Sequence, residues 1–226
     1  HSIAIGKNSG SDTQQSYAVA IGDQTAAYSQ GFSAISIGNL AGYTGQGEKS
    51  VAIGNQSGYT GQGTNSIAIG NLAAGWLQGP FAVAIGEQAG YTGQSYGAVA
   101  IGNNSGNDTQ GLNSISIGSY AGNVNQNQGA VAIGSSAASL NQGEYSIGIG
   151  YFSGDQNQTT NSISIGPYAG NTTQGITGIG GEFGASIAIG ASSGNTNQRG
   201  QAVAVGYFAG NTEQGSASVA IGGSAG

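Results

Sequence analysis

Few residues in this chain have side chains that can transfer a proton, attack a substrate or hold a metal ion. The 226 residues include no cysteine and a single histidine, His1, and the nine acidic residues share no common spacing. A nucleophile, a base and an orienting acid cannot be assembled from such a set. The aspartate spacing of a calcium-binding roll and the lysine of a phosphate-binding loop are also missing. The sequence therefore predicts a non-enzymatic protein with no catalytic residue, no metal site and no cofactor.

The charge balance narrows the choice of partners. Only 5% of the residues are charged, and the formal net charge is -6. The three basic residues, Lys7, Lys49 and Arg199, cannot neutralise a run of phosphates, so we expect no nucleic-acid binding. No stretch approaches the roughly 18 consecutive apolar residues of a membrane helix, so we expect no membrane insertion. The chain begins at His1 without an initiator methionine, which suggests a processed product or an excised segment whose export signal would not be visible.

Glutamine is the one polar residue with a fixed spacing. It lies eight residues after a glycine that itself follows Ile or Val, without exception, at Gln14, Gln30, Gln46, Gln62, Gln78, Gln94, Gln110, Gln126, Gln142, Gln158, Gln174, Gln198 and Gln214. In stacked coils these amides would be roughly 4.8 Å apart, close enough for each to donate to the next. We predict a structural ladder, with Gln46, Gln62, Gln78, Gln94 and Gln110 as its candidate residues. A row of ligand-binding amides is the alternative.

The glycines set the period of the whole chain. The fourteen Ile/Val-Gly pairs that close the repeated strands leave thirteen intervals, and twelve of these are sixteen positions long, as from Gly54 to Gly70. The exception is the longer interval from Gly166 to Gly190. A short fixed period is typical of stacked coils. We predict an all-β, parallel β-solenoid of about 14 coils with two extended segments per coil, forming one domain over residues 1–226 with an eight-residue insertion within 175–185.

Each repeat opens with alternating large and small residues, as in the segment 66–70, Ser-Ile-Ala-Ile-Gly. This period of two is typical of a strand. We predict that Ile67 and Ile69 point into the coil and that the Ala and Ser positions point out. The invariant glycine after each strand predicts a corner with positive φ or a close backbone approach. Four residues later Ala26, Ala74 and Ala138 replace glycine, which suggests a limit set by space rather than by φ.

The column between the two aliphatic positions contains only Ala, Ser and one Gly. A solvated strand face normally carries larger polar residues. We interpret this column as a flat self-association face that another sheet can approach closely. Its candidate residues are Ala4, Ala20, Ser36, Ala52, Ala68, Ala84 and Ala100.

Two other features predict surface contacts. The insertion contains Ile176, Ile179 and Phe183, which form a candidate contact loop. Aromatic residues recur at shared phases in the turns, for example at Tyr43, Tyr59 and Tyr91, and at Tyr120, Phe152, Tyr168 and Phe208. These rings either bind a sugar or a protein partner or stack on neighbouring coils.

The run Ser-Ile/Val-Ala-Ile-Gly, as in the segments 50–54 and 186–190, resembles the haemagglutinin-type head repeats of trimeric autotransporter adhesins. The resemblance covers the strand and glycine corner of nearly every coil, although the period is sixteen in this chain and typically fourteen in the family. It implies a parallel β-roll, left-handed and trimeric, that binds extracellular matrix or host surfaces. The constant glutamine is a second departure from the pattern of the family.

Three functions fit these patterns. The first is a structural or adhesive subunit of an extracellular or cell-surface fibre, whose partner is another copy of itself in a filament or trimer, with a surface glycan or matrix protein as a further partner. Such a subunit would associate through solenoid ends, the Ala/Ser face, or both. The second is a spacer or receptor-binding module of a phage or viral fibre. The third is an ice-binding solenoid, which ranks last because the relevant column has six threonines among thirteen positions, interrupted by bulky residues.

Overall fold

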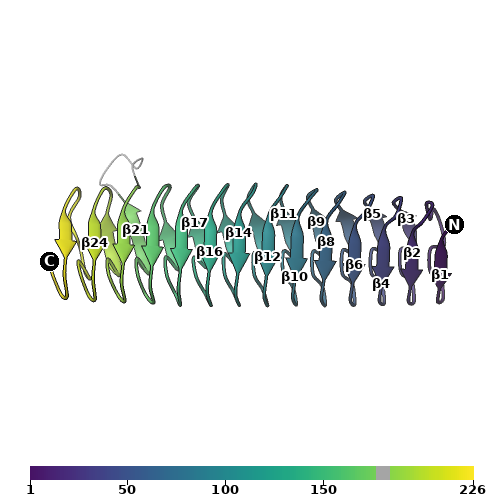
Figure 1. The fold of residues 1–226 in the computed structure, drawn as a ribbon, viewed down its shortest axis with the longest axis horizontal. Helices are drawn as coiled ribbons and strands as arrows, with labels where there is room; N and C mark the ends of the chain where they lie inside the picture. The colour runs from purple at the N-terminus through teal and green to yellow at the C-terminus, as the bar shows by residue number, and fades with distance from the viewer. Residues whose placement is uncertain (177–183) are drawn as a thin grey trace. The chain divides into compact units, whose positions relative to one another are not determined.

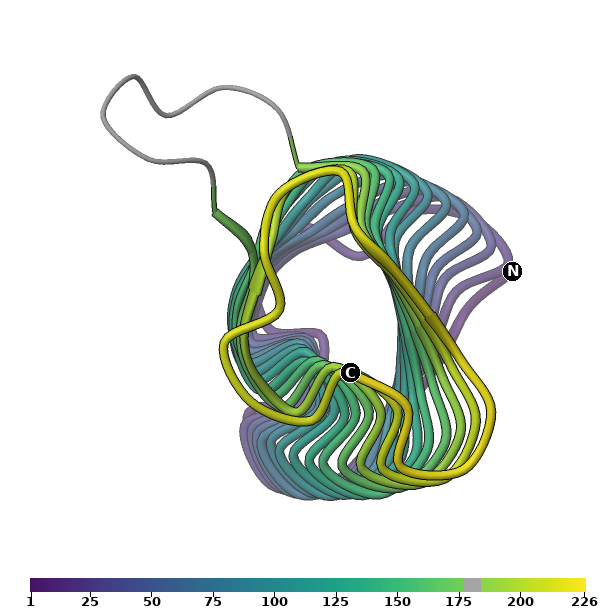
Figure 2. The same cartoon turned by 90° about the vertical axis from the view of Figure 1, so that its left-hand side faces the viewer.

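The computed structural model describes residues 1–176 and 184–226, and the secondary structure in these ranges consists of β-strands without helices. The chain forms two compact units, His1–Asn113 and Ser114–Gly226. Both units are stacks of the same coil, with parallel strands that recur at the period of the sequence, so the predicted β-solenoid is confirmed in each (Figures 1 and 2). The assignment of residues 1–226 to one domain stays a prediction.

Every coil contributes one three-residue strand to a first parallel sheet. In the first unit these strands are β1 (Ile3–Ile5), β2 (Val19–Ile21), β4 (Ile35–Ile37), β6 (Val51–Ile53), β8 (Ile67–Ile69), β10 (Val83–Ile85) and β12 (Val99–Ile101). In the second unit they are β14 (Ile115–Ile117), β16 (Val131–Ile133), β18 (Ile147–Ile149), β20 (Ile163–Ile165), β22 (Ile187–Ile189), β24 (Val203–Val205) and β25 (Val219–Ile221). Equivalent residues lie opposite each other, so Val83 pairs with Val99 and, across the insertion, Ile163 pairs with Ile187.

The second extended segment of each coil forms a second parallel sheet. Its strands in the first unit are β3 (Tyr28–Gln30), β5 (Thr44–Gln46), β7 (Thr60–Gln62), β9 (Trp76–Gln78), β11 (Thr92–Gln94) and β13 (Asp108–Gln110). In the second unit they are β15 (Val124–Gln126), β17 (Leu140–Gln142), β19 (Gln156–Gln158), β21 (Thr172–Ile176) and β23 (Thr196–Arg199).

The middle residue of these second-sheet strands has a left-handed backbone, with φ of 54° at Asn141 and 69° at Gly61. This conformation breaks the simple alternation of a strand, so in β17 Leu140 and Asn141 are both exposed and only Gln142 is buried. Glycine and asparagine, which tolerate positive φ, are frequent at this position. The local backbone thereby aims one glutamine per coil inward.

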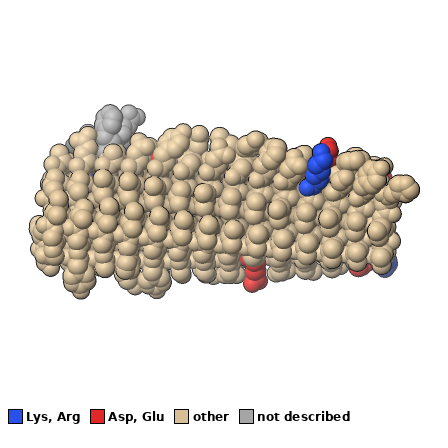
Figure 3. Space-filling view, viewed as in Figure 1, with Lys and Arg blue, Asp and Glu red and all other residues tan. Residues whose placement is uncertain are grey.

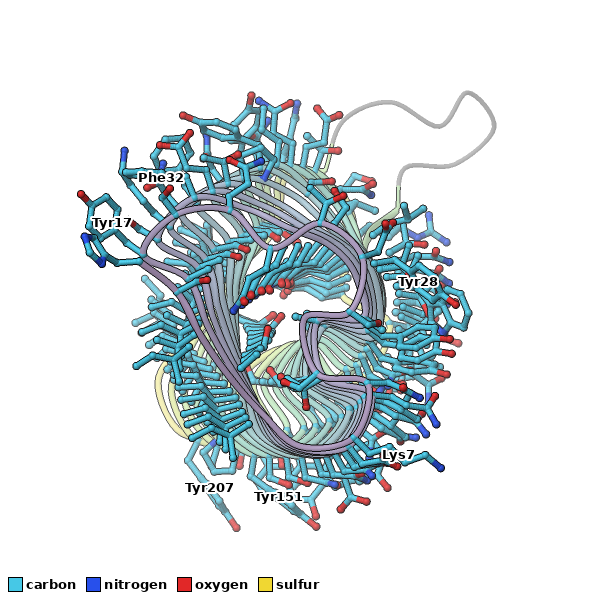
Figure 4. The ribbon with its side chains drawn as sticks, turned by 90° about the vertical axis from the view of Figure 1, so that its right-hand side faces the viewer. Lys7, Tyr17, Tyr28, Phe32, Tyr151 and Tyr207 are labelled. Carbon is cyan, nitrogen blue, oxygen red and sulfur yellow. The ribbon has the colours of Figure 1, made fainter. Side chains whose placement is uncertain are left out.

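The predicted orientation of the first-sheet side chains is wrong. The small residues point into the coil, where Ala20, Ser36 and Ala52 have no exposed surface, and the Ile and Val residues on either side point outward. The buried hydrophobic side chains among the described residues are all alanines. Figure 4 shows rows of side chains that point into the coils and others that point outward from the surface.

The reason for this inversion is the small width of the coil. A Cβ added at Gly148, which occupies the inward position of β18, would lie 3.0 Å from the Ser153 carbonyl oxygen and 3.2 Å from the Ala138 Cβ. A methyl or hydroxymethyl group fills that space, and an Ile or Val side chain would overlap the opposite wall. The absence of large residues in the Ala/Ser column therefore reflects the narrow interior.

The glycine corner after each first-sheet strand is confirmed. These glycines have φ between 116° at Gly222 and 140° at Gly22, a region that other residues rarely adopt. Close approach also requires glycine, because a Cβ at Gly70 would lie 2.5 Å from the carbonyl oxygen of Gly86 in the next coil. At the second small position we predicted that space matters more than φ, but the backbone conformation is left-handed even where alanine replaces glycine, with φ of 47° at Ala26 and 48° at Ala74.

We expect Gly134→Ala to destabilise the protein by about 2–4 kcal/mol, because the alanine would be strained at φ of 128° and its Cβ would press on the Gly150 carbonyl oxygen. Thermal unfolding followed by circular dichroism measures the effect. Gly215→Ala is the matched control, since a Cβ there meets nothing within 4 Å. Equal melting temperatures for the two variants would contradict this account of the corner.

Candidate functional site

The glutamine side chains connect the two sheets across the interior of each coil. In all thirteen cases the Gln Nε2 donates to the main-chain carbonyl oxygen eleven residues earlier, which belongs to the first residue of the same coil's first-sheet strand. The contacts range from 2.7 to 2.9 Å, as from Gln62 to Val51 and from Gln174 to Ile163. One amide per coil thus fixes the distance between the walls.

The same amides also link successive coils from Gln78 to Gln110 and from Gln126 to Gln214, so the predicted ladder is confirmed over these steps. Nε2 donates to the Oε1 of the next glutamine at 3.0–3.3 Å in the steps from Gln78 to Gln94, Gln94 to Gln110, Gln126 to Gln142, Gln142 to Gln158, Gln158 to Gln174, Gln174 to Gln198 and Gln198 to Gln214. The step from Gln174 to Gln198 spans the insertion, so the ladder keeps its register there. Nε2 also contacts the carbonyl oxygen four residues ahead, as from Gln142 to Ser146.

Serine completes the ladder where an inward position carries a hydroxyl group. Ser36 Oγ donates to the Oε1 of Gln46 at 2.6 Å, and Ser116 Oγ donates to the Oε1 of Gln126 at 2.7 Å. Among the described residues, the buried Oε1 atoms of Gln30, Gln62 and Gln78 have no hydrogen-bond partner, so the links between amides are interrupted in this part of the first unit. Gln46, Gln62, Gln78, Gln94 and Gln110 are nevertheless at most 3% exposed and bond to their own coil, which is the geometry of structural side chains rather than of a ligand-binding row.

Asp155 is the one carboxylate among the described residues that is buried, with 7% of its surface exposed. Burial raises the pKa of this group, although hydrogen bonds with Gln156 and Ser139 act in the opposite direction. Asn occupies the equivalent position in other coils, where its Nδ2 donates to a carbonyl oxygen of the preceding coil. Examples are Asn171 to Phe152 at 2.9 Å and Asn211 to Ser192 at 2.8 Å.

The remaining charges are sparse and exposed. Lys49 pairs with its neighbour Glu48 at 2.9 Å on the surface, and the face drawn in Figure 3 carries few blue or red atoms. Within residues 1–176 and 184–226, no three His, Cys, Asp or Glu side chains come together as a metal site would require. The same ranges contain no helix long and apolar enough to cross a membrane.

The candidate self-association face does not lie on the surface. Ala20, Ser36, Ala52, Ala68, Ala84 and Ala100 line the interior, and only Ala4, in the terminal strand β1, is exposed. What lies outside instead is a face of two aliphatic columns, which we call the Ile/Val face. In the first unit it comprises Ile3, Ile5, Val19, Ile21, Ile35, Ile37, Val51, Ile53, Ile67, Ile69, Val83, Ile85, Val99 and Ile101.

Exposure on this face is substantial even away from the chain ends. Ile37 and Ile85 of the first unit are 37% and 36% exposed, and Ile117 and Ile165 of the second unit are both 37% exposed. The strands that carry the face contain no charged residue. Sequence reasoning identified these columns but assigned them to the interior, because period-two alternation does not specify which side is buried.

The candidate contact loop falls mostly outside the described residues. Ile176 is the last residue of β21, and Ile179 and Phe183 lie outside the described ranges. The register between β21 and β23 shifts beside the insertion, where Ile176 is opposite Arg199.

The turn aromatics stack on neighbouring coils in both units. In the second unit Phe152 and Tyr168 are parallel with ring centroids 5.8 Å apart, and Tyr151 contacts both edge-on. In the first unit Tyr43 and Tyr59 are stacked at 5.1 Å. Tyr28 and Trp76 pack against Tyr43 and Tyr59 in the first unit. The sequence did not reveal these contacts, because Tyr28 and Trp76 lie one position further along the repeat than the two tyrosines.

Comparison with known proteins finds no matching family model and no matching curated protein.

We expect Gln142→Met to lower the free energy of unfolding by about 2–4 kcal/mol, because the carbonyl oxygen of Val131 and the Oε1 of Gln158 would lose a buried donor.

Gln142→Glu should lower the free energy of unfolding by more than Gln142→Met at pH 7, and this destabilisation should become smaller in acid. Burial raises the pKa of such a carboxyl above its unfolded value, so the penalty grows as pH rises through the folded pKa. Urea unfolding at pH 4 and pH 7 measures both effects, and a cost for Gln142→Met no larger than that for exposed Gln15→Met would contradict the ladder's role.

Asp155→Asn should stabilise the protein at pH 7 by about 0.5–1.5 kcal/mol. The asparagine removes a buried charge, and its Nδ2 should donate to the Ser136 carbonyl oxygen, which is the equivalent of the acceptors in the other coils. The pKa of Asp155 is higher in the folded protein than in the unfolded chain. The carboxyl therefore contributes its full stability below the unfolded pKa, and this contribution is lost as pH rises through the folded pKa. The advantage of asparagine should therefore shrink as the pH falls toward about 4. A pH-independent difference in urea midpoints would contradict the assignment.

Proposed function

We propose that this chain is a non-enzymatic structural or adhesive subunit of an extracellular or cell-surface fibre, and that it associates with other copies of itself through the Ile/Val face. The observation that carries the proposal is the exposure of this uncharged, two-column aliphatic surface in both units. Soluble monomers rarely leave a large contiguous apolar patch uncovered, and such patches mark interaction sites.

The shape and chemistry of the face favour a second copy as its occupant. Its side chains repeat at the coil spacing of about 4.8 Å, so an identical surface offers ridges with the same spacing and the same apolar character. A self-complementary patch is what an isologous, two-fold interface requires. The resemblance of the Ser-Ile/Val-Ala-Ile-Gly run to the heads of trimeric adhesins also supports self-association. No charged group of the first-sheet strands would be left desolvated in such an interface.

Replacing Ile37 and Ile85 together by lysine tests this proposal. We expect the unaltered protein to sediment as an oligomer and the double variant to sediment as a monomer, because two charges would be buried without partners in the interface. Analytical ultracentrifugation over a hundredfold range of concentration is the measurement, with electron microscopy to distinguish filaments from compact oligomers.

The matched control places the same two charges on the second sheet, as Thr44→Lys with Thr92→Lys. This variant should keep the oligomeric state of the unaltered protein, and circular dichroism should show that both double variants fold. A monomeric unaltered protein at every concentration, or equal dissociation of the two variants, would overturn self-association through the Ile/Val face.

A further inference from the structure

Five successive coils of the first unit each place one aromatic ring on the same line along the edge of the second sheet. We call this set the aromatic strip, and its members are Tyr28, Tyr43, Tyr59, Trp76 and Tyr91. Ring centroids are 5.3 Å apart from Tyr28 to Tyr43, 5.1 Å from Tyr43 to Tyr59 and 5.5 Å from Tyr59 to Trp76. The line continues through a hydrogen bond of 3.2 Å from Trp76 Nε1 to the hydroxyl group of Tyr91.

The strip stays continuous although its residues do not occupy one sequence column. Tyr43, Tyr59 and Tyr91 share a column, but in two coils that column carries Ala27 or Gly75. In both of those coils the next residue is aromatic, and it supplies the missing ring. Gly75 has a further role, because an added Cβ would lie 2.6 Å from the Tyr91 ring. The ring line is therefore continuous over five coils.

The surroundings of the strip are neutral and rich in hydroxyl groups. Segments 26–29, 42–45, 58–61, 74–77 and 90–93 contain no charged residue. The three tyrosines of the shared column are each followed by a threonine, namely Thr44, Thr60 and Thr92. A glycine comes next in each case, so no side chain projects from the surface at that position. Tyr28 and Trp76 are 49% and 43% exposed, and Figure 4 shows Tyr28 pointing away from the coil.

This combination matches the surface of an uncharged sugar polymer. A pyranose ring has an apolar face of C–H groups and a rim of hydroxyl groups. The apolar face suits the exposed rings of Tyr28 and Trp76, and the hydroxyl rim suits the Tyr and Thr hydroxyl groups beside them. The coil spacing of about 4.8 Å is close to the length of one sugar unit in an extended chain. We propose that the aromatic strip binds a neutral, extended, β-linked polysaccharide, with its chain lying along the strip across these five coils.

This site goes beyond the proposed self-association and does not depend on it. The strip lies on the second sheet, and the Ile/Val face lies on the first. If the protein binds sugar as a monomer, the sugar site stands and self-association through the Ile/Val face is overturned. If it forms an oligomer that binds no sugar, self-association stands and the sugar site is overturned.

Trp76 is the only tryptophan of the chain, so its fluorescence reports directly on the strip. The experiment titrates the whole chain with hexasaccharides of β-linked glucose, xylose and N-acetylglucosamine. We expect at least one of them to shift or quench the emission saturably. Affinity should rise with chain length up to about four or five units, because the strip extends for about 19 Å, and a disaccharide should bind far more weakly.

Tyr59→Leu removes one ring from the middle of the strip and keeps Trp76 as the reporter. We expect it to weaken binding about two- to tenfold. Phe152→Leu is the matched control, since it removes a stacked ring of the second unit and should leave binding unchanged. Melting curves of both variants show whether the fold persists.

Four results would overturn the proposal. The first is no emission change with any hexasaccharide at millimolar concentration, and the second is equal affinity for Tyr59→Leu and Phe152→Leu. The third is an emission that depends on protein concentration and not on sugar, which would show that a second copy covers the strip. The fourth is a loss of binding in Phe152→Leu alone, which would place the sugar site elsewhere.

Discussion

The hydrogen bond from each glutamine Nε2 to the first-sheet carbonyl of its own coil is the interaction on which the other features depend. It sets the distance between two walls that would otherwise have only small side chains between them. At Gln94, Nε2 donates to the carbonyl oxygen across the coil, to the carbonyl oxygen four residues ahead and to the next glutamine, and Oε1 accepts from the preceding glutamine, Gln78. Cohesion within a coil and cohesion between coils therefore come from the same side chain.

The narrow interior has a direct consequence for the surface. A globular domain buries its large aliphatic residues, but here methyl and hydroxymethyl groups fill the space beside the amides, so the β-branched residues of the first sheet must face outward. There they still favour the strand conformation and pack on their neighbours up and down the sheet. The fold thus gains strand propensity from Ile and Val and leaves a substantial part of their surface available to a partner.

One position of the coil is used in two ways. Five coils of the first unit carry the ring line from Tyr28 to Tyr91 along this edge of the second sheet, whereas Asn107 of the same unit and Asn171, Asn195 and Asn211 of the second unit donate to the preceding coil. Both arrangements tie successive coils together. The aromatic one also places exposed rings such as Tyr28 and Trp76 on the surface, so the surface chemistry differs between coils that share a backbone.

The sequence by itself determined the period, the parallel stacking, the glycine corners and the glutamine ladder, because these follow from columns that recur at a fixed interval. It also divided the first-sheet residues correctly into two opposite faces. It could not decide which face is buried, since alternation is symmetric and the deciding quantity is the width of the interior, set by amides crossing from a strand eleven residues away. For the same reason the Ala/Ser column was read as an outer face, and the membership of Tyr28 and Trp76 in the aromatic strip emerged only from their packing in three dimensions.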